Sequence, residues 1–209
     1  MRNQRKLIIA IDGPAGSGKS TVARLVARTL KAMRQKVSLE DSKKLAGLAR
    51  DARIHFEDGL GKQKVFLDGK NVTKNIRLPE LTKNVFYVAK TPLIRREMVK
   101  KQRALGKKQG AVMEGRDIGT VVFPRADCKF YLDANPRVRA RRRYKELIKS
   151  GKQAAFNEVL ADLKKRDLSD KTRSEGPLRK AKDALRIDTT SLTIERVVDR
   201  ILQVISRVG

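Results

Sequence analysis

The sequence predicts an α/β fold built on a parallel sheet, and two observations support this. Short apolar runs typical of buried strands alternate with segments of helical periodicity, a pattern that favours a parallel sheet covered by helices. A glycine-rich loop also joins the first predicted strand directly to the first predicted helix. The four predicted core strands are residues 7–11, 110–114, 128–132 and 184–188.

The glycine-rich loop runs from Gly13 to Ser20 and has the pattern G-x-x-x-x-G-K-[ST]. Its three glycines permit backbone conformations that a Cβ forbids, and N–H groups at the start of a helix attract anions. Lys19 would add a positive charge for the β- and γ-phosphates, and the Ser20 hydroxyl is a hard ligand of the kind Mg²⁺ prefers. A plain glycine turn would need neither Lys19 nor three glycines. The loop therefore predicts binding of a nucleoside triphosphate with Mg²⁺.

Composition limits the classes of protein to consider. The 209 residues include 50 Lys and Arg against 23 Asp and Glu, a net charge of +27 that predicts weak, non-specific binding of polyanions. The basic residues are spread along the chain, so charge does not separate a nucleic-acid protein from an enzyme for small anionic substrates. No apolar run reaches the roughly 18 residues of a membrane span. The single Cys128, in a strand-like run, predicts a packed thiol and a cytoplasmic protein.

Smaller elements follow from turn and capping signals. Short runs separated by Asp-Gly pairs predict a small antiparallel sheet within residues 54–73, in which the lone His55 is expected to be structural. Capping residues and prolines predict helices that begin at residues 42, 79, 92, 136 and 194. The last of these helices is strongly amphipathic, and residues 165–173 are expected to form a charged loop.

Polar residues follow three of the predicted core strands. They are Asp12, the pair Arg116-Asp117, and Asp133. Because the carboxyl ends of parallel strands share one edge of a sheet, we expect these residues to border a common site. The alternative for Arg116 and Asp117 is an ion pair at the protein surface that has no functional role.

Arginines are concentrated in two later segments. Arg139, Arg142 and Arg143 have the spacing of one helix face, and Arg166 and Arg173 flank a segment that could fold over the site. The planar, always charged guanidinium suits phosphoryl oxygens. A solvated basic helix and a charged loop are the alternatives that the sequence leaves open.

Together these motifs resemble the bacterial cytidylate kinase family, over most of the chain. The resemblance is carried by IAIDGPAGSGKST, VFLDGKNVT, IRLPE, MEGRDIGTVVFP, ARRRYKEL, KRDLSDKTR with PL, and IDTTSLTIERVVDRI. It implies a P-loop NTPase three-layer α/β/α core with a parallel sheet, a small antiparallel nucleotide-binding insertion and a helical lid. On this basis the core would be residues 1–40, 110–150 and 177–209, the insertion 41–109 and the lid 151–176.

The same resemblance implies an activity and a set of site residues. The activity is transfer of the γ-phosphoryl group of ATP to CMP or dCMP, with Mg²⁺ held partly by Ser20, in a protein expected to be a monomer. The catalytic residues would be Lys19, Arg116, Arg166 and Arg173. The ATP-binding residues would be Gly13, Pro14, Ala15, Gly16, Ser17, Gly18, Lys19, Ser20, Thr21, Arg142 and Arg143. The CMP-binding residues would be Arg95, Arg116, Asp117, Arg166, Asp170 and Arg173.

Within this set the resemblance assigns roles to the CMP-binding residues. Arg116 would hold the CMP phosphate, Asp170 would contact the ribose, and Arg95 with Asp117 would recognise cytosine. The chemistry agrees, because a carboxylate accepts from the cytosine amino group and an arginine donates to N3 or O2, whereas uracil presents the reverse pattern.

The sequence departs from the family at two places. Family members carry a strand ending in D-T-G-x-x-Y-R shortly after the first helix, and its arginine grips the acceptor phosphate. This chain runs through Leu30-Lys31 with no such motif, either because the segment is deleted or because it has been dropped from the sequence. Phe86 stands where the family usually has a small hydroxyl residue. Both departures concern the acceptor rather than ATP.

Three functional hypotheses therefore remain at the level of sequence. The first is a cytidylate kinase. The second is a family member with a defective acceptor site that acts as a basic nucleotide- or RNA-binding protein. The third is a kinase for another small acceptor.

Overall fold

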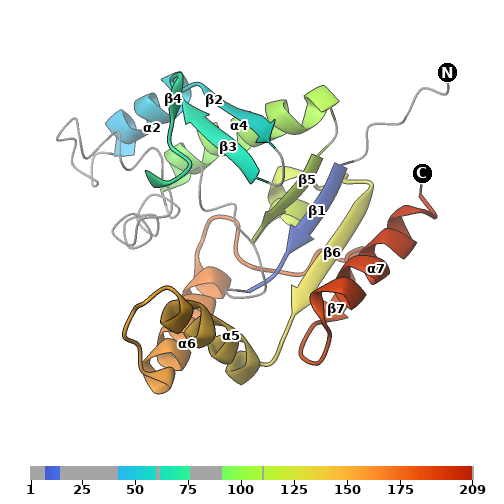
Figure 1. The fold of residues 1–209 in the computed structure, drawn as a ribbon. Coiled ribbons are helices and arrows are strands. Elements are labelled where there is room, and N and C mark those ends of the chain that lie inside the picture. The colour runs from blue at the N-terminus through green and yellow to red at the C-terminus, as the bar shows by residue number, and fades with distance from the viewer. Residues whose placement is uncertain (1–7, 15–41, 60–61, 76–90, 110, 209) are drawn as a thin grey trace. The chain divides into compact units, whose positions relative to one another are not determined.

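The computed structural model describes residues 8–14, 42–59, 62–75, 91–109 and 111–208 (Figure 1). The chain forms two compact units, a first unit of residues 1–20 with 103–209 and a second unit of residues 21–102. Residues 15–41, with most of the glycine-rich loop, and the helix predicted from residue 79 lie outside the described residues. Within the described part, no helix is long and apolar enough to cross a membrane.

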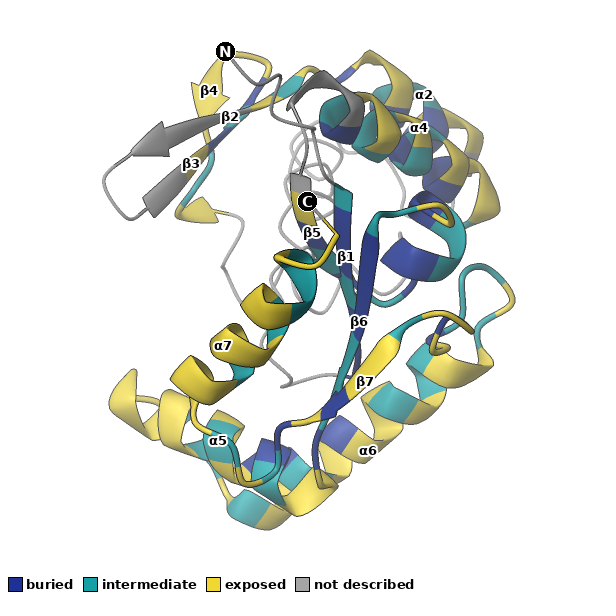
Figure 2. Ribbon diagram, turned by 90° about the vertical axis from the view of Figure 1, so that its right-hand side faces the viewer, coloured by how far each residue is buried: buried dark blue, intermediate teal, exposed yellow. Residues whose placement is uncertain are grey.

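The first unit contains a four-stranded parallel sheet in the order β5-β1-β6-β7. The strands are β1 (Ile8–Asp12), β5 (Ala111–Gly115), β6 (Cys128–Asp133) and β7 (Leu185–Asp188). Each one begins and ends within a residue of its predicted position, so the parallel α/β fold is confirmed. The interior strands β1 and β6 are largely buried (Figure 2).

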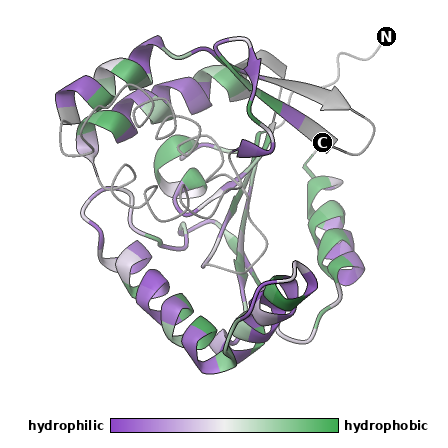
Figure 3. Ribbon diagram, turned by 60° about the vertical axis from the view of Figure 1, so that its left-hand side comes forward, coloured by the Kyte–Doolittle hydropathy of each residue, from purple (hydrophilic) through white to green (hydrophobic). Residues whose placement is uncertain are grey.

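One face of this sheet packs against α7 (Ile194–Ile205). The buried residues of that face are Ile9, Cys128, Phe130 and Ile187. The Thr193 side chain accepts a hydrogen bond from the Arg196 N–H and caps the helix, as its sequence predicts. Ile201, Val204 and Ile205 pack on the sheet, whereas Ile194, Val198 and Leu202 stay exposed. Figure 3 shows the apolar residues of α7 among its polar ones.

Strand β5 differs from the buried strand that its apolar sequence predicts. Met113 is 4% exposed, but Val112 is 69% exposed although it lies in register with Ile9, which is 7% exposed. The physical reason is position: β1 is the one described strand that pairs with β5, so β5 forms an edge of the described sheet.

Two helices of the first unit pack against each other. They are α5 (Pro136–Lys149) and α6 (Phe156–Thr172), joined by a core of Ala140, Val159 and Leu163. The Asn135 side chain accepts from the Arg137 N–H, which confirms the predicted start of α5. The prediction of a charged loop over residues 165–173 is wrong, because α6 continues to Thr172. A helix accommodates Lys, Arg, Asp and Leu side chains when oppositely charged groups pair with the charged ones. Ion pairs of this kind join α6 to its neighbours and are described below.

The second unit combines a helix pair with a small antiparallel sheet. The sheet is β2 (Ile54–Gly59), β3 (Lys62–Leu67) and β4 (Lys70–Asn71), as predicted. The turn between β3 and β4 has positive φ at Asp68 (50°) and Gly69 (78°), which is why an Asp-Gly pair occurs there. His55 stacks on the cross-strand Phe66 at 4.7 Å between ring centroids, a structural role.

The helices of this second unit supply its core. They are α2 (Ser42–Asp51) and α4 (Pro92–Gln109), whose last turns belong to the first unit. The core residues are Leu45, Ala46, Ala49, Ile94 and Met98, with Leu48 and Ile54 packed around them. Both helix starts agree with the sequence.

The buried Cys128 should be chemically inert in the folded protein. Burial raises the pKa of its thiol, and the nearby Asp127 carboxylate adds to that shift. We expect iodoacetamide to alkylate Cys128 far more slowly in the native protein than in urea, with the rate rising only at higher pH than for the unfolded chain, because the thiolate is the reactive form. Mass spectrometry after timed quenching measures both rates. Equal rates in the two conditions would contradict the packed position.

Candidate functional site

The site begins where β1 ends, at the carboxyl edge of the parallel sheet. Asp12 is 3% exposed, and its two carboxylate oxygens accept hydrogen bonds from the N–H groups of Ile118 and Gly119, each at 2.7 Å. The donating turn is η2 (Ile118–Val122), a single π-helical turn that follows β5. Next to Asp12, Gly13 has φ 153°, in the region that favours glycine. The carboxylate thus fixes the start of the glycine-rich loop to the Arg116-Asp117 segment, as the shared edge predicted.

Close packing explains the two glycines around that segment. A Cβ on Gly115 would lie 2.7 Å from Cγ1 of Ile118, and one on Gly119 would lie 3.3 Å from Oδ2 of Asp12. Larger residues at either position would therefore push the turn away from the Asp12 carboxylate.

A short ion pair joins the segment after β5 to α6. Arg116 Nε donates to Asp170 Oδ2 at 2.7 Å, and both side chains are 13% exposed. The structure therefore brings together two predicted site residues that are 54 positions apart in the sequence. The pair orients the Arg116 guanidinium at the carboxyl edge of the sheet.

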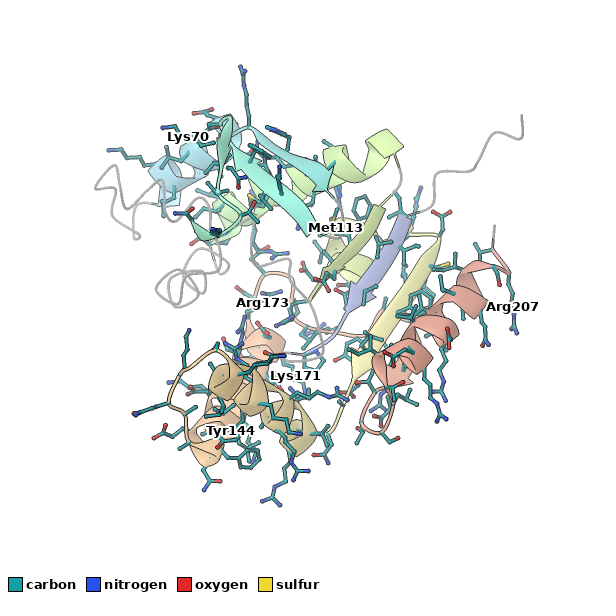
Figure 4. The ribbon with its side chains drawn as sticks, in the orientation of Figure 1. Lys70, Met113, Tyr144, Lys171, Arg173 and Arg207 are labelled. Atoms are coloured by element: carbon teal, nitrogen blue, oxygen red, sulfur yellow. The ribbon has the colours of Figure 1, made fainter. Side chains whose placement is uncertain are left out.

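Arg173 lies directly after α6 and completes this arrangement (Figure 4). Its Nε donates to the Gly176 carbonyl at 2.7 Å, while its terminal nitrogens lie 3.6 Å from Asp117 Oδ1 and 3.9 Å from Asp170 Oδ1. Those two separations exceed ordinary hydrogen-bond lengths. Arg173 is thus anchored through its Nε, and its terminal nitrogens face two carboxylates more loosely than Arg116 does.

Arg166 contributes a third positive charge. Its pKa is lowered, first by desolvation and next by the charge of Arg116, with Arg143 adding a further like-charge effect. The residue as a whole is exposed on α6. Among the described residues Arg166 has no hydrogen bond or ion pair. The charges of Arg116 and Arg143 therefore both act on the Arg166 guanidinium.

The three arginines of α5 do not act as one cluster, although their spacing suggested a common face. Arg139 is buried, with NH1 2.7 Å from Asp167 Oδ2 and Nε donating to the Ala134 carbonyl. Arg142 donates to the carbonyl and hydroxyl of Thr189. Arg143 pairs with the exposed Glu146. Their different partners and depths therefore give the three arginines different environments, and Arg139 is the buried one.

Asp133, the third strand-end residue, has a different environment. Its Oδ2 lies 2.7 Å from Arg186 NH2 of β7, and its Oδ1 accepts from the Ala134 N–H at 2.9 Å. This carboxylate is engaged in joining β6 to β7, so the structure does not place it with Arg116 and Asp117.

Other predicted residues are not brought to this site by the described structure. Residues 15–21 of the loop lie outside the described ranges, and Arg95 lies in the first turn of α4 in the second unit. Sequence reasoning missed the structural roles of Asp12 and Asp167. The signal for Asp12 was a carboxylate at the end of an apolar strand, and Asp167 gave none beyond its place in a charged run.

Metal binding by the described residues alone is not indicated, since none of them form a group of three or more His, Cys, Asp or Glu able to hold an ion. Mg²⁺ in phosphoryl-transfer sites usually keeps several waters and takes one or two protein ligands with the substrate phosphates. The predicted donor set of Ser20 and ATP therefore fits without such a group.

The Asp12 hydrogen bonds should be important for stability. Replacing Asp12 with Asn removes one acceptor and leaves a buried N–H unpaired, so we expect a loss of about 2 kcal/mol in the free energy of unfolding. Urea denaturation followed by circular dichroism measures it. The matched control is Asp188→Asn at the exposed end of β7, where the carboxylate also accepts a backbone N–H, from Thr190. Equal shifts in the two variants would contradict the role of Asp12.

The buried and exposed ion pairs of α5 should contribute differently to the free energy of unfolding, measured again by urea denaturation. Asp167→Ala leaves the Arg139 charge buried without this partner, and we expect a loss of about 3 kcal/mol. Glu146→Ala removes the partner of Arg143 in a pair whose side chains are 52% and 66% exposed, and should cost less than about 0.5 kcal/mol. A cost for Glu146→Ala as large as that for Asp167→Ala would show that burial does not decide the outcome.

Comparison with known proteins identifies the family of the chain. The Cytidylate kinase family profile matches residues 9–207. The cytidylate kinase of Bacillus subtilis (strain 168) is 43% identical over 220 positions, which cover 98% of each chain. Those of Geobacillus sp. (strain WCH70) and Limosilactobacillus reuteri (strain DSM 20016) are 43% and 44% identical and cover 100% and 96% of both chains.

The alignment lengths also bear on the missing motif. The Geobacillus alignment spans 226 positions although this chain has 209 residues, so at least 17 aligned positions have no residue here. A segment lost from this chain would have this effect on the alignment. The family match nevertheless runs through the glycine-rich loop, the Arg116-Asp117 turn, Arg166 and Arg173. The chain belongs to the cytidylate kinase family.

Proposed function

We propose that this chain transfers the γ-phosphoryl group of ATP to CMP or dCMP. Cytidylate kinase activity is implied by the family and by its curated relatives, which makes the chain a phosphotransferase with a nucleotide co-substrate. The choice of CMP and dCMP as acceptors, Mg²⁺ as the ion and the residues that bind each of them are the parts we add.

The observation that carries this proposal is the gathering of Arg116, Asp170, Arg173 and Asp117 at the carboxyl edge of the sheet. Arg166 lies near this group, and its pKa is lowered first by desolvation and then by the charge of Arg116, which a bound dianion would offset. A phosphoryl group offers such charge, with oxygens that match the planar guanidinium fork. The cluster therefore favours a phosphate ligand over the solvated basic surface that the sequence left open.

Asp170 would hold Arg116 in position when no phosphate is bound. Its carboxylate accepts from Arg116 Nε, and the terminal nitrogens of that guanidinium remain for a ligand, although one also approaches the Gly115 carbonyl at 3.4 Å. Arg173, anchored through Nε, adds positive charge beside Asp117 and Asp170. In phosphoryl transfer, such positioned charges stabilise the oxygens of the transferring group and supply most of the catalysis.

The donor half of the site would be the glycine-rich loop. Residues 13–21 would surround the ATP phosphates with backbone N–H groups, with Lys19 as a mobile charge and Arg142 and Arg143 as further contacts. Mg²⁺ held by Ser20 and the phosphates would neutralise charge during transfer. Asp12 would act indirectly, since it fixes the first residue of the loop to η2.

Acceptor specificity would come from Asp117 and Arg95. Asp117 is 5% exposed, and Arg173 is the described cation 3.6 Å from its carboxylate. A desolvated carboxylate rejects the uracil carbonyl, which would face it without a donor. A monomeric state and a cytoplasmic location stay predictions.

The acceptor prediction is tested by ADP formation in a coupled assay with ATP, Mg²⁺ and one acceptor at a time. We expect CMP and dCMP to exceed UMP and AMP by about 100-fold or more in kcat/KM. Asp117→Asn should reduce that preference, and Arg116→Met should lower kcat/KM for CMP by roughly 10- to 100-fold through loss of a charged hydrogen bond. The control is Arg141→Met, on the exposed side of α5.

Two outcomes would overturn the proposal. Turnover with UMP or AMP equal to that with CMP would point to another acceptor. No turnover with any of them, together with tight RNA binding that weakens steeply with salt, would favour the alternative of a basic RNA-binding relative with a defective acceptor site.

A further inference from the structure

Arg103 joins the last turns of α4 to η2. Its Nε donates to the Val122 carbonyl at 2.8 Å, and its NH2 donates to the Val121 carbonyl at 2.7 Å. These turns of α4 belong to the first unit, as η2 does. One planar guanidinium thus bonds two successive carbonyls, which the rigid fork of arginine allows and the compact ammonium of lysine does not match. The two bonds hold the carbonyl end of η2 on α4.

The residues that Arg103 bonds also hold Asp117. The N–H groups of Val121 and Val122 donate to the Asp117 carbonyl at 2.9 Å and 3.2 Å. The two valines therefore bond Asp117 through their N–H groups and Arg103 through their carbonyls. Single π-helical turns such as η2 are rare and are frequent at functional sites. Loss of the Arg103 bonds would loosen this turn, and the backbone of Asp117 would move with it.

The turn is held from two sides. At its start, Asp12 accepts the N–H groups of Ile118 and Gly119, and at its end Arg103 donates to the carbonyls. The two anchors come from different elements, since Asp12 ends β1 beside the glycine-rich loop and Arg103 lies on α4. Asp117 directly precedes η2, so the direction of its side chain depends on both anchors.

Gly106 permits the close approach of α4 to the end of η2. A Cβ at Gly106 would lie 2.5 Å from Cζ of Phe123, which follows η2 and is 7% exposed. Any larger residue would therefore have to displace a buried ring. Glycine is less favourable than alanine inside a helix, and this packing is the physical reason for it here. Gly106 is three positions from Arg103 and shares its helix face, so the two residues form one junction.

We propose that Arg103, together with Gly106, is a positioning residue for acceptor recognition, because it holds η2 so that the Asp117 carboxylate meets the amino group of the acceptor base. Arg103 acts through the backbone of η2 and does not touch the substrate. The inference rests on the proposed role of Asp117 in selecting cytosine. A purely structural arginine would affect turnover of every acceptor equally, whereas a positioning arginine changes the choice between acceptors.

The test compares kcat/KM for CMP and UMP in the natural chain and in Arg103→Met, which keeps an unbranched apolar stem and removes both donors. We expect the preference for CMP to fall about tenfold, mainly through a higher KM for CMP. The KM for ATP should change less than about twofold, because Asp12 still holds the start of η2. The control is Lys100→Met, which removes a charge from the same helix at a side chain that is 71% exposed.

Gly106→Ala separates positioning from helix stability. Alanine favours the helix more than glycine does, yet its methyl group would push α4 away from Phe123. We therefore expect the preference for CMP to fall as it does in Arg103→Met, although the helix itself is not weakened. A preference that stays unchanged in either variant would overturn the inference.

Hydrogen exchange of the free protein gives a readout without turnover. The N–H groups of Val121 and Val122 should exchange at least about tenfold faster in Arg103→Met than in the natural chain, and Lys100→Met should leave them unchanged. A natural chain that prefers CMP but shows equal exchange in Arg103→Met would overturn this inference alone. A natural chain without a preference for CMP would overturn the proposed function, whatever the exchange rates show.

Discussion

The structure of the site depends on one buried carboxylate. Asp12 ends the first strand of the sheet, and its two oxygens accept the N–H groups of Ile118 and Gly119. These bonds fix the start of the glycine-rich loop to the turn that carries Arg116 and Asp117. A carboxylate hydrogen-bonded in the interior resists movement, since breaking either bond leaves a buried polar group unsatisfied. Residues that are about a hundred positions apart thereby belong to one rigid edge.

The charge distribution around that edge explains how a chain of net charge +27 can hold arginines in defined positions. Arg139 is neutralised by Asp167 in the interior, and Arg116 by Asp170 near the surface. Arg166, in contrast, is exposed to repulsion from Arg116 and Arg143. Paired arginines provide rigidity, and the excess positive charge provides attraction for an anion. The strong basic charge elsewhere on the chain has no such local explanation in the structure.

Much of the fold was predictable from the sequence because the signals for its elements were local. Apolar runs gave the four strands, the Asp-Gly pairs gave the small sheet, and Asn135 and Thr193 gave two helix starts. The pairing of Arg116 with Asp170 agreed with their predicted placement in one site, although no local pattern specified the bond. The predictions that failed depended on tertiary partners. Residues 165–173 are mostly helical because α6 packs on α5. Arg139 is separate from Arg142 and Arg143 because it pairs with Asp167 in the interior.

The exposed Val112 shows a different limit of sequence reasoning. Its apolar strand predicts burial, which requires a neighbour that the described sheet does not provide. The D-T-G-x-x-Y-R motif is also absent from the sequence, and the resemblance to the family implies that its arginine would bind the acceptor phosphate. The remaining arginines would then have to bind the acceptor phosphate without it.

The claim that Arg116 binds the acceptor phosphate is tested most directly by the ¹⁵Nε resonance of Arg116 during titration with CMP. If Arg116 binds the acceptor phosphate, its hydrogen bond to Asp170 changes on binding, and the resonance should shift and saturate with CMP. The resonance of Arg139, paired in the interior, should stay in place. An Arg116 resonance unchanged at CMP concentrations that support turnover would contradict the account.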